Sequence, residues 1–471
     1  MKDCCKGGFD LAVIGAGSAG FSAAITAAEA GAKVALIGYG TIGGTCVNVG
    51  CVPSKAMIRA VEPLHAARAA SRFDGIVSTA HISDWSALIA QKQEIIDTLR
   101  AAKYTNVLPS HPLVTYLEGA ARFTPEGALL VAGERIEAPK VIIATGSRPH
   151  VPALKGLDTV DWLDSTSALA LPDLPATMMI MGGGFIGVEL AQIFARAGTR
   201  VTIVTRHGLL PDAEPEISAA LTACFTDEGI SVLSGLAYQQ VSQSAGQVAL
   251  EATQDGARVT ISAERLLLAT GRVPNSDGLS LEAAGIETDT RGGILTDAAM
   301  LTSRAGTYAA GDVTGRDQFV YMAAYGAKIA ARNAIGNAGL SYDNSVMPAV
   351  VFSDPQVATV GLTQAQARAR GYDVVTSVLP MEHVPRALAA RDTRGLIKLV
   401  AEAETKRLLG AHILAPEGAD SIQTAAMALQ ADMTYDALGA MVFPYLTNVE
   451  GLKLAAQTFE KDVAKLSCCA G

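Results

Sequence analysis

Two cysteines separated by four residues are the side chains best suited to redox chemistry in this sequence. Cys46 and Cys51 lie in the segment 43–55, which reads Gly-Gly-Thr-Cys-Val-Asn-Val-Gly-Cys-Val-Pro-Ser-Lys and ends at Lys55. Thiolates attack disulfide bonds and also bind soft metal ions. The pair therefore predicts either disulfide exchange or metal chemistry, and its spacing alone does not choose between them.

The other cysteines occur mostly in adjacent pairs near the two ends of the sequence. These are Cys4-Cys5 and Cys468-Cys469, whereas Cys224 stands alone in a stretch expected to be helical. Adjacent cysteines close only a small ring as a disulfide, which requires a strained or cis peptide bond. They are better suited to hold one soft metal ion as two thiolates. We expect Cys224 to be a small buried residue.

The elements that must position Cys46 and Cys51 begin with a nucleotide-binding pattern, which the chain contains twice. Each copy consists of a strand, a Gly-x-Gly-x-x-Gly turn, a helix and a second strand. The turn lets backbone N–H groups and the positive end of the helix approach a pyrophosphate. The expected strands are 11–14 and 33–37 in the first copy, and 177–181 and 200–204 in the second; the glycines are Gly15, Gly17, Gly20, Gly182, Gly184 and Gly187.

The length and the remaining pattern predict an α/β protein with about three domains. Further apolar strands end near Gly146, Gly271 and Asp312. From about residue 341 the pattern changes to strands and helices typical of a separate α+β domain. A hydrophobic content of 49% with 18% charged residues is typical of a well-packed globular protein.

The order of these motifs resembles that of the class I flavoprotein disulfide reductases, and the resemblance covers essentially the whole chain. It implies two Rossmann-like dinucleotide-binding domains, for FAD and NADPH, followed by a C-terminal α+β dimerisation domain in a homodimer. The expected boundaries are 1–150 for the first part of the FAD domain, 151–272 for the NADPH domain, 273–340 for the second part of the FAD domain, and 341–471 for the dimerisation domain with its Cys-Cys tail.

The resemblance also implies roles for individual residues. Cys51 would lie against the flavin ring, and Cys46 would be the outer thiol that meets the substrate. Lys55 would lie near the flavin and pair with Glu189 of the second nucleotide helix. The resemblance also implies further cofactor contacts. Those expected for FAD include Gly15, Gly17, Gly20, Thr45, Gly146 and Asp312. The other expected cofactor-binding residues are Gly182, Gly184, Gly187, Arg206 and Gly271.

In Rossmann folds an acidic residue at the end of the second strand usually binds a ribose. Neither nucleotide-binding copy of this chain has an acidic residue at that position. In the first copy this position is Gly38, so the FAD ribose must find another partner or bind through backbone and water. In the second copy the strand is followed by Arg206, which is placed to pair with the 2′-phosphate of NADPH. The alternative for Arg206 is a solvated charge at the end of a strand.

Two features near the C-terminus bear on the substrate. Disulfide reductases generally carry a His-Glu pair for acid–base chemistry on a thiol, but here Tyr445 stands in place of the histidine while Glu450 remains. A phenol with a pKa near 10 is a poor thiol base at neutral pH. The Cys468-Cys469 tail resembles that of the mercuric reductases within this family, as do the stretches 318–321 and 347–352.

The resemblance therefore implies reduction of Hg(II), presented as a thiolate complex, to Hg(0), with the active sites at the subunit interface. Cys468 and Cys469 of the partner subunit would pass the metal to Cys46 and Cys51. The alternatives are a dihydrolipoamide or glutathione-type disulfide reductase, and a metal-sequestering relative without turnover. The Gly-Met-Thr-Cys-x-x-Cys motif of an N-terminal metal-binding domain is absent, and Cys4-Cys5 is either a weak Hg(II) capture site or part of a plain leader.

Charge and hydropathy exclude some partners. The net charge of -9 argues against nucleic acid and anionic membrane surfaces. No targeting or membrane-inserting segment is evident, because the early apolar stretch is interrupted by glycines and charged residues. We therefore expect a cytoplasmic protein, where seven cysteines are not a structural disulfide framework.

Overall fold

Residues 8–463 are described by the computed structural model, and the chain divides into two structural units. Each unit gathers three separate segments of the chain. The first consists of Met1–Ala56, Ala87–His150 and Gly271–Asn344, and the second consists of Met57–Ser86, Val151–Thr270 and Ser345–Gly471. Because both units are discontinuous, residues far apart in the sequence meet within each of them.

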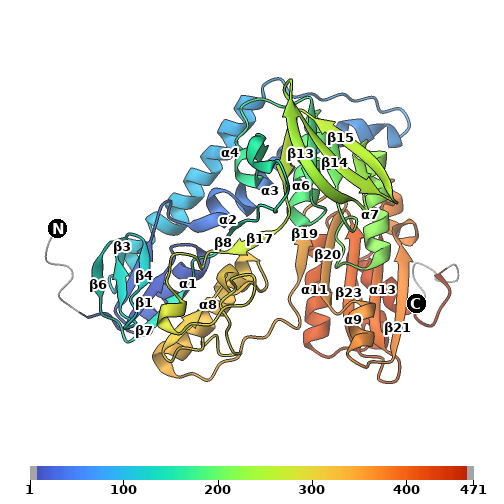
Figure 1. Cartoon of the computed structure of the whole chain (residues 1–471). Coiled ribbons are helices and arrows are strands. Elements are labelled where there is room, and N and C mark those ends of the chain that lie inside the picture. The colour runs from blue at the N-terminus through green and yellow to red at the C-terminus, as the bar shows by residue number, and fades with distance from the viewer. Residues whose placement is uncertain (1–7, 464–471) are drawn as a thin grey trace. The chain divides into compact units, whose positions relative to one another are not determined.

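The first unit is built on a five-stranded parallel sheet in the order β18-β7-β1-β2-β3. Strand β1 is buried on both faces, as expected of a parallel strand covered on each side. Helices α1 and α8 lie side by side (Figure 1), and the Ser22 hydroxyl donates to the Ala324 carbonyl over 3.0 Å. The bounds are β1 Leu11–Ile14, α1 Ser18–Glu29, β2 Val34–Gly38, β3 Val114–Glu118, β7 Lys140–Ile143, β18 Thr307–Ala309 and α8 Val320–Gly336.

Shorter elements complete the first unit. The thiol segment forms the short helix α2 and the start of the long helix α3, which continues into the second unit. The bounds are α2 Gly44–Asn48, α3 Cys51–Ala69, α4 Trp85–Arg100, β4 Ala121–Phe123, β5 Leu129–Val131, β6 Glu134–Ile136, β8 Ser147–Pro149 and β17 Arg272–Pro274.

The second unit contains another parallel sheet, in the order β12-β11-β10-β16-β9, and a three-stranded antiparallel sheet, β13-β14-β15. Helix α6 follows β10 through the second glycine turn, and its buried face includes Val188 and Ile193. The bounds are β9 Trp162–Leu163, α5 Ser165–Ala168, β10 Thr177–Met181, α6 Phe185–Ala197, β11 Arg200–Val204, α7 Pro215–Asp227, β12 Ser231–Leu233, β13 Ala237–Ser244, β14 Gln247–Gln254, β15 Ala257–Ala263 and β16 Arg265–Leu268.

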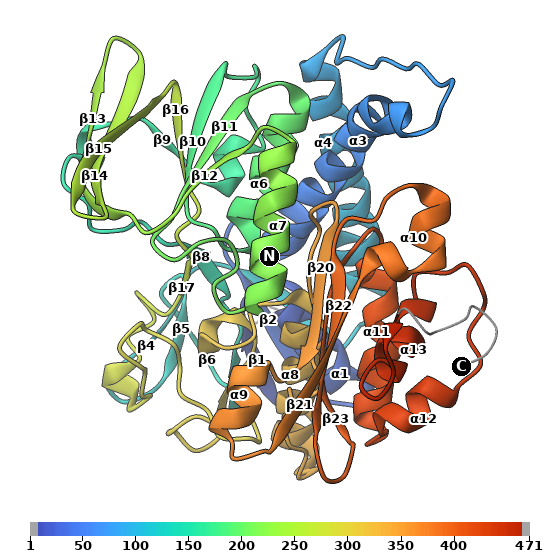
Figure 2. The same ribbon diagram turned by 90° about the vertical axis from the view of Figure 1, so that its right-hand side faces the viewer.

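The C-terminal part of the second unit is a five-stranded antiparallel sheet in the order β19-β20-β23-β22-β21. Helices α11 and α13 pack on this sheet through a core that includes Ile413, Ile422 and Leu452 (Figure 2). The bounds are β19 Ala349–Val351, β20 Gln356–Gly361, α9 Gln364–Ala369, β21 Val374–Pro380, α10 Pro385–Ala390, β22 Leu396–Glu402, β23 Leu408–Ala415, α11 Gly418–Gln430, α12 Tyr435–Ala440 and α13 Glu450–Gln457.

The architecture confirms the predicted fold class: two dinucleotide-binding folds and a C-terminal α+β domain. The predicted strands at 11–14, 177–181 and 200–204 have the observed bounds of β1, β10 and β11. Cys224 is buried in α7, as expected. Among residues 8–463, no helix combines the length and apolar character that a membrane crossing needs.

Candidate functional site

The two cysteines of the redox motif are reduced thiols joined by a hydrogen bond. Cys46 is in α2 and is half-buried, whereas Cys51 is the exposed first residue of α3. The hydrogen bond with Cys51, and then burial, raise the pKa of the Cys46 thiol, while the positive charge of Lys55 opposes this rise. Cys46 is therefore the thiol that keeps its proton when only one of the two ionises, which leaves Cys51 as the hydrogen-bond acceptor.

A hydrogen-bonded asparagine fixes the loop that carries Cys46. The Asn48 amide donates to the carbonyls of Ile42 and Gly44, both over 2.9 Å. Its carbonyl accepts a 3.0 Å hydrogen bond from Arg100 at the end of α4. The loop conformation is thereby fixed by Arg100, which is 52 residues away along the chain, and Asn48 is a positioning residue for the thiol pair.

Two tyrosines lie near the thiols, and the sequence assigned neither a role, although Tyr321 ends the stretch 318–321 noted above. The hydroxyls of Tyr104 and Ser18 lie 2.9 Å apart, and burial, followed by the charges of Cys46 and Cys51, raises the pKa of Tyr104 despite that hydrogen bond. Burial and the charge of Cys51 also raise the pKa of Tyr321, to about 12. Both side chains are therefore neutral phenols at pH 7. Tyr104 carries no motif and lies on a π-helical turn after α4, so only the fold reveals it.

The first glycine turn fits the pyrophosphate of FAD. A Cβ atom at Gly15 would lie 2.2 Å from the Ala144 carbonyl oxygen, and one at Gly20 would lie 1.7 Å from the Gly15 oxygen, so only glycine allows this close packing. Helix α1 begins after Gly17 without a side-chain cap and without an acidic residue in its first turn. Its positive end and its N–H groups are thus directed to an anion from the ligand.

Asp312 follows β18 at the same carboxyl edge of the parallel sheet as the first glycine turn, and hydrogen bonds hold it in place. Its carboxylate accepts a 2.6 Å hydrogen bond from the Ser147 hydroxyl, which in turn accepts one from Arg272 over 2.7 Å. Gly146 and Gly271, adjacent to these residues, both have positive φ angles of 72° and 104°. The expected contact residues 146, 271 and 312 therefore meet within the first unit, while Thr45 is exposed in α2 beside Cys46.

The second glycine turn repeats the first. A Cβ at Gly182 would lie 2.3 Å from the Ala269 oxygen, and one at Gly187 would lie 2.1 Å from the Gly182 oxygen. Helix α6 begins after Gly184, again without a side-chain cap or an acidic residue in its first turn. This turn therefore also fits a pyrophosphate.

Arg206 is exposed just beyond β11, where the sequence placed it. Its guanidinium lies over the Tyr238 ring, 5.3 Å from the ring centroid. The Tyr238 hydroxyl donates to the Val204 carbonyl over 2.9 Å, and burial raises the pKa of this phenol to about 12. Tyr238 thus holds the arginine at the end of the strand, where an incoming 2′-phosphate would meet it.

Helix α6 forms hydrogen bonds with the segment before β20 through one residue in each of its turns. Buried Glu189 accepts a 3.0 Å hydrogen bond from the Phe352 N–H. Gln192 bonds both the N–H and the carbonyl of Asp354, over 2.7 and 2.8 Å. Arg196 then reaches the Asp354 carboxylate over 3.0 Å. These contacts fix the rotation of α6, and with it the position of Glu189.

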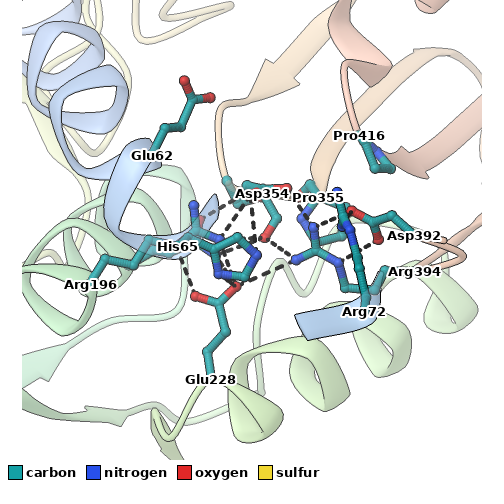
Figure 3. Close-up of polar contacts among 12 residues, drawn as sticks. Glu62, His65, Arg72, Arg196, Glu228, Asp354, Pro355, Asp392, Arg394 and Pro416 are labelled. Atoms are coloured by element: carbon teal, nitrogen blue, oxygen red, sulfur yellow. Dashed lines mark hydrogen bonds and ion pairs between the residues drawn. The ribbon is translucent and has the colours of Figure 1, made fainter. Parts of the chain in front are cut away.

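Arg196 belongs to a buried ionic network, which we call the Asp354 network (Figure 3). Its side chain is only 3% exposed and forms two hydrogen bonds with Glu228, of 2.9 and 2.6 Å. Arg394 donates to Asp354 over 2.9 Å and to Asp392 over 2.8 Å. All these residues lie in the second unit, and no sequence motif indicated them.

The segment around Tyr445 and Glu450 differs from a His-Glu acid–base pair. Tyr445 is 52% exposed, whereas Glu450, at the start of α13, is buried. The Glu450 carboxylate accepts a 3.2 Å hydrogen bond from the Leu446 N–H of its own loop. Glu450 therefore braces the loop that presents Tyr445.

Four of the predicted residues lie outside the part of the chain that the structure describes. Cys4, Cys5, Cys468 and Cys469 lie outside the described residues 8–463. The expected pairing of Lys55 with Glu189 would join the two units, and it stays a prediction. Within residues 8–463, no group of three or more His, Cys, Asp or Glu side chains is arranged to hold a metal ion.

Comparison with known families agrees with this arrangement. Residues 9–331 match the family described as pyridine nucleotide-disulphide oxidoreductase, and residues 347–456 match the dimerisation domain of the same family. The chain belongs to this family. It is an FAD- and NADPH-dependent oxidoreductase, and the two glycine turns described above fit the two cofactors.

Individual proteins of this family are similar to the chain over most of its length. The chain is 44% identical to a mercuric reductase from Lysinibacillus sphaericus, over 98% of this chain and 85% of that protein. It is 45% identical to a mercuric reductase from Streptomyces lividans, over 98% of this chain and 99% of that protein. Among solved structures, it resembles the HOCl-induced flavoprotein disulfide reductase RclA from Escherichia coli, with 32% identity and a TM-score of 0.83 over 95% of this chain and 99% of that one.

Proposed function

We propose that this chain is a mercuric reductase that reduces Hg(II) to Hg(0) with NADPH, through FAD and the thiols of Cys46 and Cys51. The observation that carries the proposal is the accessible, hydrogen-bonded thiol pair in a chain whose Glu450 braces a tyrosine loop instead of a histidine. A thiol pair without that acid–base partner suits a metal ion better than a disulfide. Identities of 44–45% with mercuric reductases across 98% of the chain support this choice.

The thiols act by ligand exchange. A Hg(II) ion arrives bound to two thiolates from solution, and each exchange forms one Hg–S bond at Cys46 or Cys51 and breaks one bond to the carrier. The proton that Cys46 holds is displaced by the metal and is taken up by the departing thiolate. The charge of Lys55 favours ionisation of Cys46 and so assists this step.

The reduction consumes one NADPH per metal ion. FAD supplies the two-electron route from NADPH to the metal site when it is bound. NADPH and Hg(II) give NADP⁺, H⁺ and Hg(0), and the thiols of Cys46 and Cys51 are regenerated because Hg(0) binds thiolates weakly. Tyr104 and Tyr321 keep their protons beside the thiols and add no negative charge that would compete for the metal.

The residues of the two glycine turns are proposed to hold the cofactors. Gly15, Gly17 and Gly20 would cradle the FAD pyrophosphate, with Asp312, Thr45 and Gly146 contacting the rest of the molecule. Gly182, Gly184 and Gly187 would cradle NADPH, with Gly271 near its binding site and Arg206 on the 2′-phosphate. Lys55 would approach the flavin ring and pair with Glu189.

The working molecule is proposed to be a cytoplasmic homodimer, with its active sites at the subunit interface. The dimerisation domain at residues 347–456 supports the dimer. In this arrangement Cys468 and Cys469 of the partner subunit deliver Hg(II), and the exposed phenol of Tyr445 contacts the metal or its ligand during transfer. A reducing cytoplasm keeps the thiols free.

The decisive experiment compares substrates on the purified, FAD-loaded protein. NADPH oxidation is followed with Hg(II) in excess thiol, with oxidised lipoamide and with oxidised glutathione, and the release of volatile mercury is recorded. We expect Hg(II)-dependent turnover that is lost in Cys51→Ser and retained in the matched control Cys224→Ala, since Cys224 is a buried residue of α7. Turnover with a disulfide and not with Hg(II) would assign a disulfide reductase, and Hg(II) binding without volatile mercury would assign a sequestering protein.

A further inference from the structure

The end of β2 lacks the acidic residue that holds the adenosine ribose in a Rossmann fold, because Gly38 stands there. Gly38 is buried, and its φ angle does not lie in the left-handed region. Glycine is therefore required at this position for space and not for backbone conformation. We therefore ask which side chain occupies the space beside Gly38, because that side chain could replace the usual carboxylate.

That side chain is Tyr116 of the neighbouring strand β3. A Cβ atom at Gly38 would lie 2.3 Å from the Tyr116 hydroxyl oxygen and 2.8 Å from the ring carbon that bears it. The two strands are parallel, with Leu36 beside Tyr116 and Gly38 beside Glu118. Tyr116 therefore shares a face with Gly38, and its ring extends along the strand to reach the tip of β2.

Gly38 is the last residue of β2 and therefore lies at the carboxyl edge of the sheet, where a Rossmann fold binds its dinucleotide. Leu36, two residues before Gly38, lies 3.6 Å from the Cβ position of Gly20 in the first turn of α1. The Tyr116 ring packs against the same core cluster as Phe21 of α1. The Tyr116 hydroxyl thus lies where the side chain of an acidic residue at position 38 would start, near the N-terminus of α1 that fits the pyrophosphate.

The hydroxyl is available to a ligand. Tyr116 is only partly buried, and no hydrogen bond joins its hydroxyl to another residue in the described range 8–463. Burial and the nearby charge of Glu118 raise its pKa, so the phenol is neutral and can both donate and accept. A ribose hydroxyl offers the complementary donor and acceptor.

From this geometry we infer that Tyr116 binds the adenosine ribose of FAD, in place of the acidic residue that Gly38 has displaced. The inference rests on FAD binding and is independent of mercury reduction. A protein that binds FAD through Tyr116 but reduces another substrate would refute the proposed function and leave this inference intact.

The test measures flavin affinity and not turnover. Apoprotein is titrated with FAD, and with an FAD analogue whose adenosine carries a 2′,3′-dideoxyribose, by quenching of flavin fluorescence. Loss of one hydrogen bond in Tyr116→Phe should raise the Kd for FAD about 3- to 10-fold and leave the Kd for the analogue unchanged. The matched control is Tyr39→Phe, which removes the hydroxyl of the adjacent tyrosine, 84% exposed. Its Kd values should equal those of the wild type.

Equal weakening of FAD and the analogue in Tyr116→Phe would overturn the inference, as would no weakening of either, or a selective effect of Tyr39→Phe. A second pair of variants tests the shared space. Gly38→Glu should lose FAD binding or fold poorly, whereas Gly38→Glu combined with Tyr116→Val should restore FAD binding, because the carboxylate then has room. FAD binding by Gly38→Glu alone with wild-type affinity would show that the phenol does not fill this space.

Discussion

Replacement of Arg196 by methionine should destabilise the second unit more than any single exposed substitution. The guanidinium is 3% exposed and forms hydrogen bonds with Glu228 and with both the carbonyl and carboxylate of Asp354. Removing one partner of a buried ion pair typically costs about 3–5 kcal/mol, since a charge is left buried without compensation. Arg394 remains 2.9 Å from Asp354 and 3.5 Å from Glu228, so we expect the lower end, about 3 kcal/mol.

This loss is measurable by differential scanning calorimetry of the FAD-loaded protein. At about 2–4 °C per kcal/mol for a unit of this size, the transition of the second unit should fall by roughly 6–12 °C. The matched control is Arg200→Met, because Arg200 is exposed at the start of β11, and its effect should be within about 0.5 kcal/mol. Equal transition temperatures for the two variants would refute the assignment of the Asp354 network as a stabilising element.

Three further outcomes follow from the structure. Burial raises the pKa values of Asp392 and Asp354, but the positive charge of Arg394 outweighs it and holds both below the ordinary value. The two carboxylates therefore contribute their full stability above about pH 4, and this contribution is lost as the pH falls further. Acid titration of the melting temperature will detect the loss. Asn48→Ala should lower kcat at least about tenfold, with no change in the KM for NADPH, because the loop of the thiol pair loses its hydrogen bonds; steady-state kinetics will measure both. Tyr238→Leu should raise the KM for NADPH by about 5- to 10-fold and leave the KM for NADH unchanged, because the ring that orients a phosphate-binding arginine is removed; kinetics with both nucleotides will separate the two effects.

Each of these outcomes has a contrary result. A melting temperature that is flat down to pH 3 would contradict the acid prediction. For Asn48→Ala, a rise in the KM for NADPH with unchanged kcat would place its effect at the nucleotide site. Equal loss with NADPH and NADH would mean that Tyr238 supports the fold of the site and not the recognition of the 2′-phosphate.

The parts of the fold that were predictable are those with short-range patterns. The two glycine-turn patterns predicted β1, β10 and β11 to the residue and β2 to within one residue, because strand burial and turn geometry are encoded locally. The three-stranded sheet β13-β14-β15 was not predicted, although β14 alternates between buried and partly exposed residues; only the pairing of β13 is interrupted, by a register shift near Tyr238. The four-segment domain assignment and the roles of the individual site residues stay predictions.

The unpredicted parts of the site depend on long-range packing. Tyr104 approaches the thiols from a π-helical turn, and Asp354 meets Arg196 from more than 150 residues away. No local pattern marks such residues. The sequence shows that Gly38 departs from the usual acidic residue, but it does not reveal Tyr116 as the neighbour, because that contact depends on the register of β3 beside β2.

The shared space of Gly38 and Tyr116 also constrains how this chain can evolve. A side chain at 38 and the phenol at 116 exclude each other, so a chain that changes from one arrangement to the other by single substitutions must pass through an intermediate with neither. That intermediate has the weakest hold on the ribose. Selection for tight FAD binding therefore disfavours the intermediate. Related chains are expected to carry either glycine at 38 with tyrosine at 116, or an acidic residue at 38 with a smaller residue at 116.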